Sequence, residues 1–222
     1  MIQDIWPKHL DNQYKNLKPG NEDTVFYFQG SSLLARPSGH FNSQNPEENV
    51  LIYPQYDEFV QGIKSSYGDK AVDNFEFIYL LSIDEEHFFL ARKTGSLERG
   101  TFLGEMADSA VHKDMYSFVR GYEFIGVDSF RKAQPREHAY AAITAFHLYG
   151  WYRDNHFCGR CGKPLKHDDK QRMLRCYCCK NMVFPKICPA VIVAVTDKDR
   201  ILLTKYAGRT YRNYALIAGF TE

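Results

Sequence analysis

Short apolar runs rich in aromatic and β-branched residues alternate with Gly, Pro and Asn through the N-terminal part of the chain. Runs of this kind are typical of β-strands bounded by turns. Phe75–Leu81 and His87–Ala91 flank the polar segment Asp84–Glu86, so we expect these two runs to form a hairpin. Further strands are expected at Thr24–Phe28, Ser32–Ala35, Val50–Tyr53 and Tyr122–Val127. The pattern predicts an N-terminal domain of mixed α/β structure.

A helical pattern follows Pro135. A proline is tolerated in the first helical turn because the N–H that it lacks has no intrahelical partner there. Apolar residues then recur at helical spacing, and the alanines among them favour a helix: Ala139, Ala142, Ile143, Phe146 and Tyr149. We therefore expect a helix that leads directly into a cysteine-rich segment.

The C-terminal part returns to strand-like patterns. Ala190–Val195 is a continuous apolar run with many β-branched residues, which is typical of a buried strand. Asp197–Asp199 is expected to form a turn, with return strands at Ile201–Thr204 and Tyr214–Ala218. Three strands are a poor independent fold, so these strands are expected to belong to a larger domain and to expose apolar surface without it.

Composition and charge narrow the class of protein. Hydrophobic residues make up 44% of the 222 residues, enough for a core, and 28 basic residues nearly balance 27 acidic ones. No run approaches the roughly 20 apolar residues of a membrane span, and no signal-peptide pattern is visible. All six cysteines lie between Cys158 and Cys188, which favours metal binding in a reducing compartment over disulfides. We expect a cytoplasmic protein.

The cysteines carry the strongest chemical signal. Cys158 and Cys161 form one C-x-x-C pair, and Cys176 and Cys179 form a second pair after a short polar stretch. Zn²⁺ takes four such ligands in a tetrahedron, and a closed shell of four thiolates leaves no position for a catalytic water. The spacing therefore predicts a structural zinc site. Gly162 suits the turn after the first pair because glycine accepts positive φ.

Lys180 holds the matching place after the second pair, and that turn is therefore expected to be less ideal. Cys178 is an alternative ligand in place of a neighbouring cysteine. His156 and His167 are alternatives too, although we expect them to be surface histidines because four cysteines already complete the shell. Cys188 is expected to be a small buried apolar residue.

The cysteine segment is locally basic, and two interpretations stay open. Its basic residues face only Asp168 and Asp169, and they are Arg160, Lys163, Lys166, Lys170, Arg172, Arg175, Lys180 and Lys186. Such a surface suits phosphates, including those of nucleic acids. A solvated surface on a small module is favoured instead, because aromatic residues that stack on bases are sparse here.

The order of these features resembles the zinc-ribbon NAD(H) diphosphatases, also called NADH pyrophosphatases, of the Nudix hydrolase superfamily. The resemblance is specific from about Ala139 to Glu222 and weak before that. It is carried by the end of the helix, both cysteine pairs and two later segments: Trp151–Phe157, Cys158–Gly162, Cys176–Cys179, Met182–Val193 and Ala215–Glu222.

The resemblance implies a homodimeric hydrolase that cleaves the diphosphate of NAD(H) to AMP and nicotinamide mononucleotide. Some family members also act on NAD-capped RNA. The family's catalytic Mg or Mn ions are held by glutamates of the Nudix box, G-x5-E-x7-R-E-U-x-E-E-x-G-U, where U is a bulky aliphatic residue. Dinucleotide substrate and divalent cations are therefore the expected partners, and no membrane is expected.

The chain matches only the opening of that box. Gly219 aligns with its first glycine, and Phe220, Thr221 and Glu222 fill its first variable places. No catalytic residue or magnesium ligand is therefore assigned, and the 222-residue chain is expected to be inactive by itself. Phe220 matches a family aromatic suited to stack on a nucleotide ring; packing against the next helix is an equally good interpretation.

The expected fold class is α+β, with an N-terminal mixed α/β domain, a zinc ribbon and the first strands of a Nudix α/β/α sandwich. The expected boundaries are residues 1–133 for the N-terminal domain, 134–155 for the connecting helix, 156–187 for the ribbon and 188–222 for the start of the Nudix domain. Two alternatives lack catalysis: a nucleic-acid-binding module and a dimerisation scaffold.

Overall fold

The computed structural model describes residues 3–39, 50–94, 118–208 and 212–221. The chain divides into two compact units, residues 1–184 and residues 185–222. Helices and a mostly antiparallel sheet occur together in the first unit, which confirms the α+β class. The finer division at residues 133, 155 and 187 stays a prediction.

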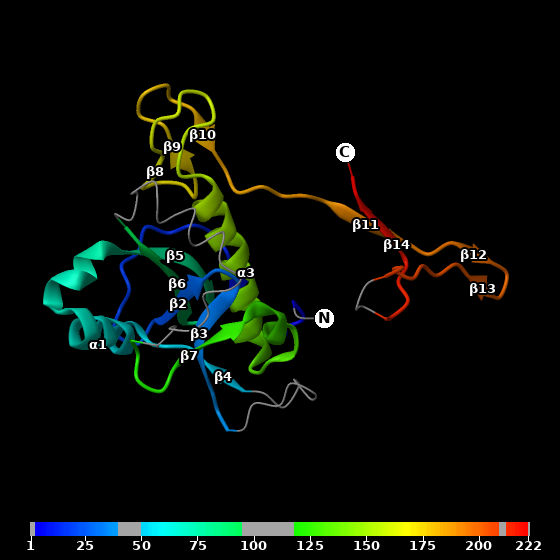
Figure 1. The fold of residues 1–222 in the computed structure, drawn as a ribbon, viewed down its shortest axis with the longest axis horizontal. Helices are drawn as coiled ribbons and strands as arrows, with labels where there is room; N and C mark the ends of the chain where they lie inside the picture. Colours follow the sequence, from blue (N-terminus) through cyan, green and yellow to red (C-terminus); the bar gives the residue numbers. More distant parts are fainter. Residues whose placement is uncertain (1–2, 40–49, 95–117, 209–211, 222) are drawn as a thin grey trace. The chain divides into compact units, whose positions relative to one another are not determined.

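A seven-stranded sheet forms the centre of the first unit (Figure 1). Its strands are β1 (Leu10–Asp11), β2 (Thr24–Gln29), β3 (Ser32–Pro37), β4 (Leu51–Ile52), β5 (Phe75–Ile83), β6 (Glu86–Lys93) and β7 (Glu123–Gly126). The strand order is β1-β5-β6-β2-β3-β4, with β7 also paired to β3. Only β2 and β6 run parallel among these pairs. Every strand expected in this region is confirmed within a few residues.

The predicted hairpin is the pair β5–β6, which turns at Asp84 and Glu85. Asp84 adopts φ 51°, a left-handed conformation that aspartate tolerates better than most residues. The register shifts between Tyr79 and Leu81, so β5 contains a bulge. The bulge places Leu80 and Leu81, two consecutive residues, in the same core cluster.

Both faces of the sheet are buried, which explains why its strands have continuous apolar runs. Side chains alternate between faces along a strand. Phe26 and Phe28 of β2 belong to one core cluster, whereas Val25 belongs to the other. A strand that is covered on both sides needs apolar residues at every position.

The first core cluster is covered by α3 (Arg136–Asp154), the predicted helix. Its N-cap is Pro135, and its buried face includes Ala139, Ala142 and Tyr152. Small alanines let the helix approach the sheet closely, and the fully buried Tyr152 fills space near the C-terminal end. A 3-10 helix, η3 (Val127–Lys132), leads from β7 toward α3.

The second cluster is covered by α1 (Tyr56–Tyr67), a helix that the sequence pattern did not predict. Gln55 and Glu58 form a capping box at its start, and Phe59 and Ile63 are buried one turn apart. The capping box and the spacing of these apolar residues are the sequence features that indicate this helix. Gly62 inside the helix obscured it, since glycine lowers helix propensity. A 3-10 helix, η2 (Asp69–Asn74), follows α1.

The described residues of the second unit include four short strands in two separate ladders. β11 (Ala190–Val193) pairs with β14 (Ile217–Phe220), and β12 (Thr196–Asp197) pairs with β13 (Arg200–Ile201). The strand and turn expected at the start of this unit are confirmed, and Ile192 in the run Ala190–Val195 is 71% exposed. Among the described residues no layer covers this ladder, so the expected exposure of apolar surface is confirmed.

Two glycines in helices give opposite predictions. A Cβ at Gly150 in α3 meets nothing within 4 Å, so Gly150→Ala should raise the free energy of unfolding by about 0.5–1 kcal/mol through helix propensity. A Cβ at Gly62 lies 2.7 Å from the Phe118 carbonyl oxygen, so Gly62→Ala should lower it by about 1–3 kcal/mol. Urea unfolding of both variants checks this; equal effects would contradict the packing around α1.

Candidate metal centre

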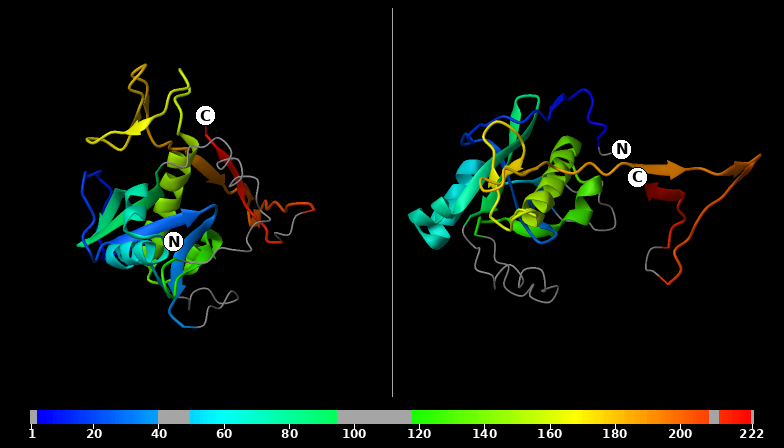
Figure 2. Two further views of the ribbon diagram at one scale, coloured as in Figure 1. Left: turned by 60° about the vertical axis from the view of Figure 1, so that its left-hand side comes forward. Right: turned by 90° about the horizontal axis from the view of Figure 1, so that it is seen from above.

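The segment after α3 forms a small module, residues 156–184, which we call the cysteine module. Its three-stranded sheet has the order β10-β9-β8, with β8 (Lys166–His167), β9 (Leu174–Arg175) and β10 (Met182–Val183). The module follows the end of α3 directly, as the yellow segment in Figure 2 shows. Such short strands cannot build a hydrophobic core of their own, so another interaction has to hold the module together.

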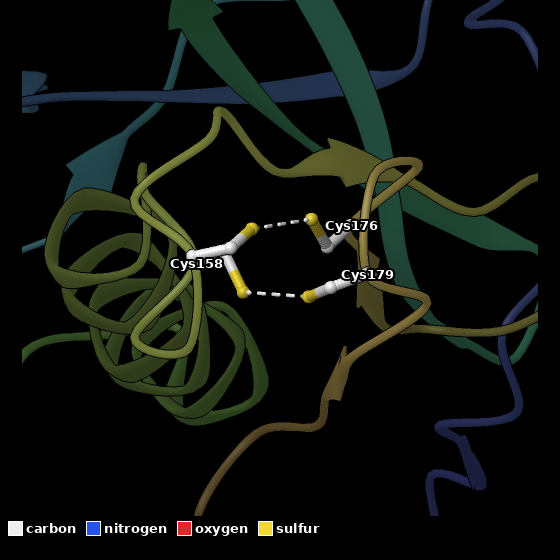
Figure 3. Close-up of side chains that lie close together, drawn as sticks. Cys158, Cys176 and Cys179 are labelled. Atoms are coloured by element: carbon white, nitrogen blue, oxygen red, sulfur yellow. Dashed lines mark hydrogen bonds between the residues drawn. The ribbon is translucent and has the colours of Figure 1, made fainter.

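Two tight turns bring four cysteine sulfurs together. Cys158 and Cys161 lie between α3 and β8, and Cys176 and Cys179 lie between β9 and β10. The Sγ atoms of Cys158 and Cys179 are 3.5 Å apart, and those of Cys161 and Cys176 are 3.4 Å apart. Figure 3 shows the labelled side chains of Cys158, Cys176 and Cys179 pointing toward one another across the module.

The two turns repeat the same backbone hydrogen bonds. In the first turn the N–H of Gly162 donates to the Cys158 carbonyl at 2.8 Å, and the N–H of Cys158 donates to the Lys163 carbonyl at 2.8 Å. The second turn repeats both bonds, Lys180 N–H to Cys176 carbonyl at 2.9 Å and Cys176 N–H to Asn181 carbonyl at 2.8 Å. The cysteine pairs are therefore presented by equivalent scaffolds.

Lys180 takes the place in the second turn that Gly162 takes in the first, and it was expected to make that turn less ideal. Gly162 has φ 69° and Lys180 has φ 62°, so the lysine takes the left-handed conformation that the turn requires. A side chain in this region costs about 1–2 kcal/mol relative to the right-handed conformation. The second turn therefore keeps the hydrogen bonds of the first turn. Its cost is the left-handed backbone conformation of Lys180.

The sulfurs fit one tetrahedral metal ion. All four Sγ atoms lie within 4.8 Å of one another. Thiolates bound to one Zn²⁺ at about 2.3 Å lie about 3.8 Å apart in a tetrahedron. The described residues therefore contain a four-cysteine group that is suited to a metal such as zinc, and no histidine or carboxylate belongs to this group.

A cation between the four sulfurs would stabilise their ionised form. The backbone N–H of Arg160 donates to the Cys158 sulfur at 3.4 Å, and this bond is the main cause that lowers the pKa of Cys158 to about 6. For Cys161, the backbone bond from Lys163 lowers the pKa, but the neighbouring thiols, led by Cys176, outweigh it and raise the pKa to about 12. Sulfurs this close cannot all ionise unless a positive charge lies between them.

The module packs on the core of the first unit. Leu174 of β9 belongs to the core cluster that α3 covers. Arg172 donates a hydrogen bond to the Leu80 carbonyl of β5, and the His167 ring lies 5.3 Å from Tyr14 and 5.6 Å from Tyr152, measured between ring centroids. The cysteine group is therefore anchored to the sheet and to α3.

The remaining cysteines and histidines of interest lie outside the sulfur group. Cys178 is exposed, and His167 is half-buried against Tyr152. His156 is half-buried too, so the expectation that both histidines lie on the surface is wrong. Cys188 is exposed, which contradicts its expected burial, because the segment between Phe184 and Ala190 joins no sheet and packs against no core.

The residues of the expected Nudix box lie at the end of the chain. Gly219 lies in β14 opposite Val191 of β11. Phe220 ends β14 and is 77% exposed, so its ring is accessible, and its stacking role stays a prediction. Glu222 lies outside the described residues.

Part of the chain is similar to curated hydrolases. A stretch of 72 residues is 36% identical to the NAD-capped RNA hydrolase NudC of Pseudomonas aeruginosa strain LESB58, covering 32% of this chain and 26% of the relative. The protein of the same name from Salmonella typhi is 33% identical over 75 residues, 34% of this chain and 29% of the relative. The protein of the same name from Pseudomonas putida strain W619 is 38% identical over 72 residues, which cover 32% of this chain and 26% of the relative.

The chain thus spans between a quarter and a third of the length of these relatives. No family model matches the chain. None of the helices in the described part of the chain is long and apolar enough to cross a membrane. About a third of the chain is therefore similar to NAD-capped RNA hydrolases.

Removing one sulfur should remove the metal. We expect Cys176→Ser to lose tightly bound zinc, because three thiolates leave the shell incomplete, whereas Cys178→Ser should keep about one zinc per chain. Zinc content after dialysis, measured by atomic absorption, checks both variants. Loss of zinc from Cys178→Ser with retention in Cys176→Ser would make Cys178 the ligand.

The equivalent turns allow a reciprocal test. Lys180→Gly should raise the free energy of unfolding by about 0.5–1 kcal/mol, because glycine removes the left-handed strain at a small entropic cost. Gly162→Lys should lower it by about 1 kcal/mol. Urea unfolding with zinc present measures both. Destabilisation by Lys180→Gly would instead mean that the 3.0 Å bond from Lys180 Nζ to the Tyr177 carbonyl outweighs the strain.

Proposed function

We propose that these residues belong to a Nudix hydrolase that cleaves the diphosphate of NAD(H) to AMP and nicotinamide mononucleotide, with NAD-capped RNA as a second substrate. The observation that carries the proposal is the similarity of about a third of the chain to NAD-capped RNA hydrolases. The order of features along the chain supports it: a four-cysteine module precedes a strand pair that contains Gly219.

The proposed role of the cysteine module is structural. Zinc bound by Cys158, Cys161, Cys176 and Cys179 would supply folding free energy and neutralise the thiolates. With four protein ligands there is no open position for water, so this metal does not activate a nucleophile. The module would then serve to join α3 to the strands that follow it.

The proposed chemistry needs a second kind of metal site. A diphosphate carries negative charge that Mg²⁺ or Mn²⁺ screens while it orients the attacking water, and these ions prefer carboxylate oxygens. Residues 1–222 match the Nudix box only at Gly219 and its first variable places, so the proposed carboxylate ligands are not among them. We propose that these residues alone do not hydrolyse NAD(H), and that the enzyme is a cytoplasmic homodimer.

One structural feature favours a nucleic-acid-binding function of the cysteine module as an alternative. Tyr177, Phe157 and Phe184 are about half exposed, with 56%, 54% and 49% of their surface accessible. Lys166 Nζ lies 5.9 Å from the centre of the Tyr177 ring. Exposed rings next to lysines can stack on bases while the lysines contact phosphates. The alternative is weakened by Arg175, which is paired with Asp168 at 3.1 Å.

An assay of the chain separates catalysis inside residues 1–222 from catalysis beyond them. We expect no AMP above background when the 222-residue chain is incubated with NADH and Mg²⁺, because the carboxylate set is missing. A protein extended through the Nudix box should release AMP and should lose activity when a chelator removes Mg²⁺. AMP is followed by chromatography. Turnover by the shorter chain would place the carboxylates within residues 1–222.

A further inference from the structure

A cleft lies where the cysteine module meets the edge of the central sheet. Its volume is about 340 Å³, which is within the range of small-molecule sites. One wall comes from β5, a second from the segment around Tyr14, and a third from β8 of the module. The sheet leaves this edge open: among the described strands β5 pairs on this side only with the two-residue strand β1, at Ser82 and Ile83.

The charged residues that line the cleft balance, two basic against two acidic, and Arg172 beside the cleft adds a positive charge. Arg92 and Glu76 line it and form an ion pair at 2.6 Å, so these two charges offset each other. Lys166 and Asp169 line it as well, and neither forms an ion pair within the described parts of the chain. Arg172 adds a further positive charge, because its ring contact with Tyr14 and its bond to the Leu80 carbonyl bring no carboxylate.

The polar groups around Arg172 are incompletely satisfied. Among the described residues six buried side-chain polar atoms lack a hydrogen-bond partner, and four of them belong to Arg172 and its surroundings: Tyr79 Oη, Tyr152 Oη, His167 Nε2 and Arg172 Nε. Buried polar atoms are nearly always paired, with protein, water or ligand. A cationic group with no anion beside it is costly to bury. Tyr79 and His167 line the cleft, so a ligand in it can supply partners to Tyr79 Oη and His167 Nε2, and an anion there offsets the charge of the neighbouring Arg172.

The walls of the cleft also suit a ring. Tyr14, Phe77, Tyr79 and His167 line it, so aromatic surface lies beside the charged groups. A simple ion such as phosphate would leave most of the volume and this aromatic surface unused. A nucleoside monophosphate combines a phosphate with a flat ring, and aromatic side chains commonly stack on bases.

We propose that this cleft binds a nucleoside monophosphate, with its phosphate directed to Arg92 and Lys166 and its base against the aromatic wall around Tyr14. Arg92 holds Glu76 at one side of the cleft and keeps further donors for a phosphate, since a guanidinium carries five N–H groups. AMP is a product of the proposed hydrolysis, but the site does not rest on that activity, because it lies in the first unit and its test measures binding alone.

Calorimetric titration of the zinc-loaded 222-residue chain tests the site. At constant ionic strength AMP should bind saturably, with one molecule per chain. Adenosine should bind at least tenfold more weakly, because it cannot neutralise the cations. Lys166→Gln should weaken AMP binding by about tenfold, the usual effect of losing one hydrogen bond to a charged group. Lys170→Gln is the matched control, because Lys170 is exposed on the same module and does not line the cleft.

Three results would overturn the proposal: no saturable heat with AMP, equal affinity for adenosine and AMP, or an equal loss of affinity in Lys166→Gln and Lys170→Gln. The last result would indicate a general electrostatic attraction instead of a defined site. Both lysines are exposed, so neither variant should unfold the protein. Circular dichroism and zinc content of each variant verify that the module is intact before its affinity is compared.

Discussion

The packing of α3 against the central sheet is the interaction on which the rest of the first unit depends. The helix buries a face of small alanines along the sheet, and the fully buried Tyr152 lies in its last turn. Tyr152 in turn contacts His167 of the cysteine module, and Arg92 of β6 lies 5.1 Å above its ring. The sheet therefore fixes α3, and the end of α3 fixes the point from which the first cysteine pair is presented.

The cysteine module has too few buried apolar residues to be stabilised by a hydrophobic core, and the four-cysteine group is positioned to stabilise it instead. Its strands are two residues long, and the buried residues that it contributes are few: Cys158, Met173, Leu174 and Cys176. Two equivalent turns hold the sulfurs close enough that they cannot all ionise alone. A metal ion bound there would remove that repulsion and link residues far apart in the module, so folding of the module and metal binding would be one equilibrium.

The sequence was most informative where one physical rule dominates. Apolar runs bounded by turn residues predicted the strands, and the C-x-x-C spacing predicted the group of four sulfurs. The helix α1 was not predicted because Gly62 lowers the helix propensity of its sequence. The close approach of Phe118 requires a glycine at this position. The predicted burial of Cys188 was wrong because burial depends on a covering layer, which residue type alone does not predict. The Arg172 contact with Leu80 joins residues 92 positions apart, and no local pattern encodes it.

The cleft and the sulfur group are connected through one strand of the cysteine module. Lys166 and His167 form β8, and β8 pairs with β9, which leads directly into Cys176. The position of the cleft wall is therefore set by the same turns that hold the sulfurs. Because a ligand that binds only the folded state stabilises it, binding of the proposed ligand in the cleft and of the proposed metal at the sulfurs should favour each other even though the two sites share no atom.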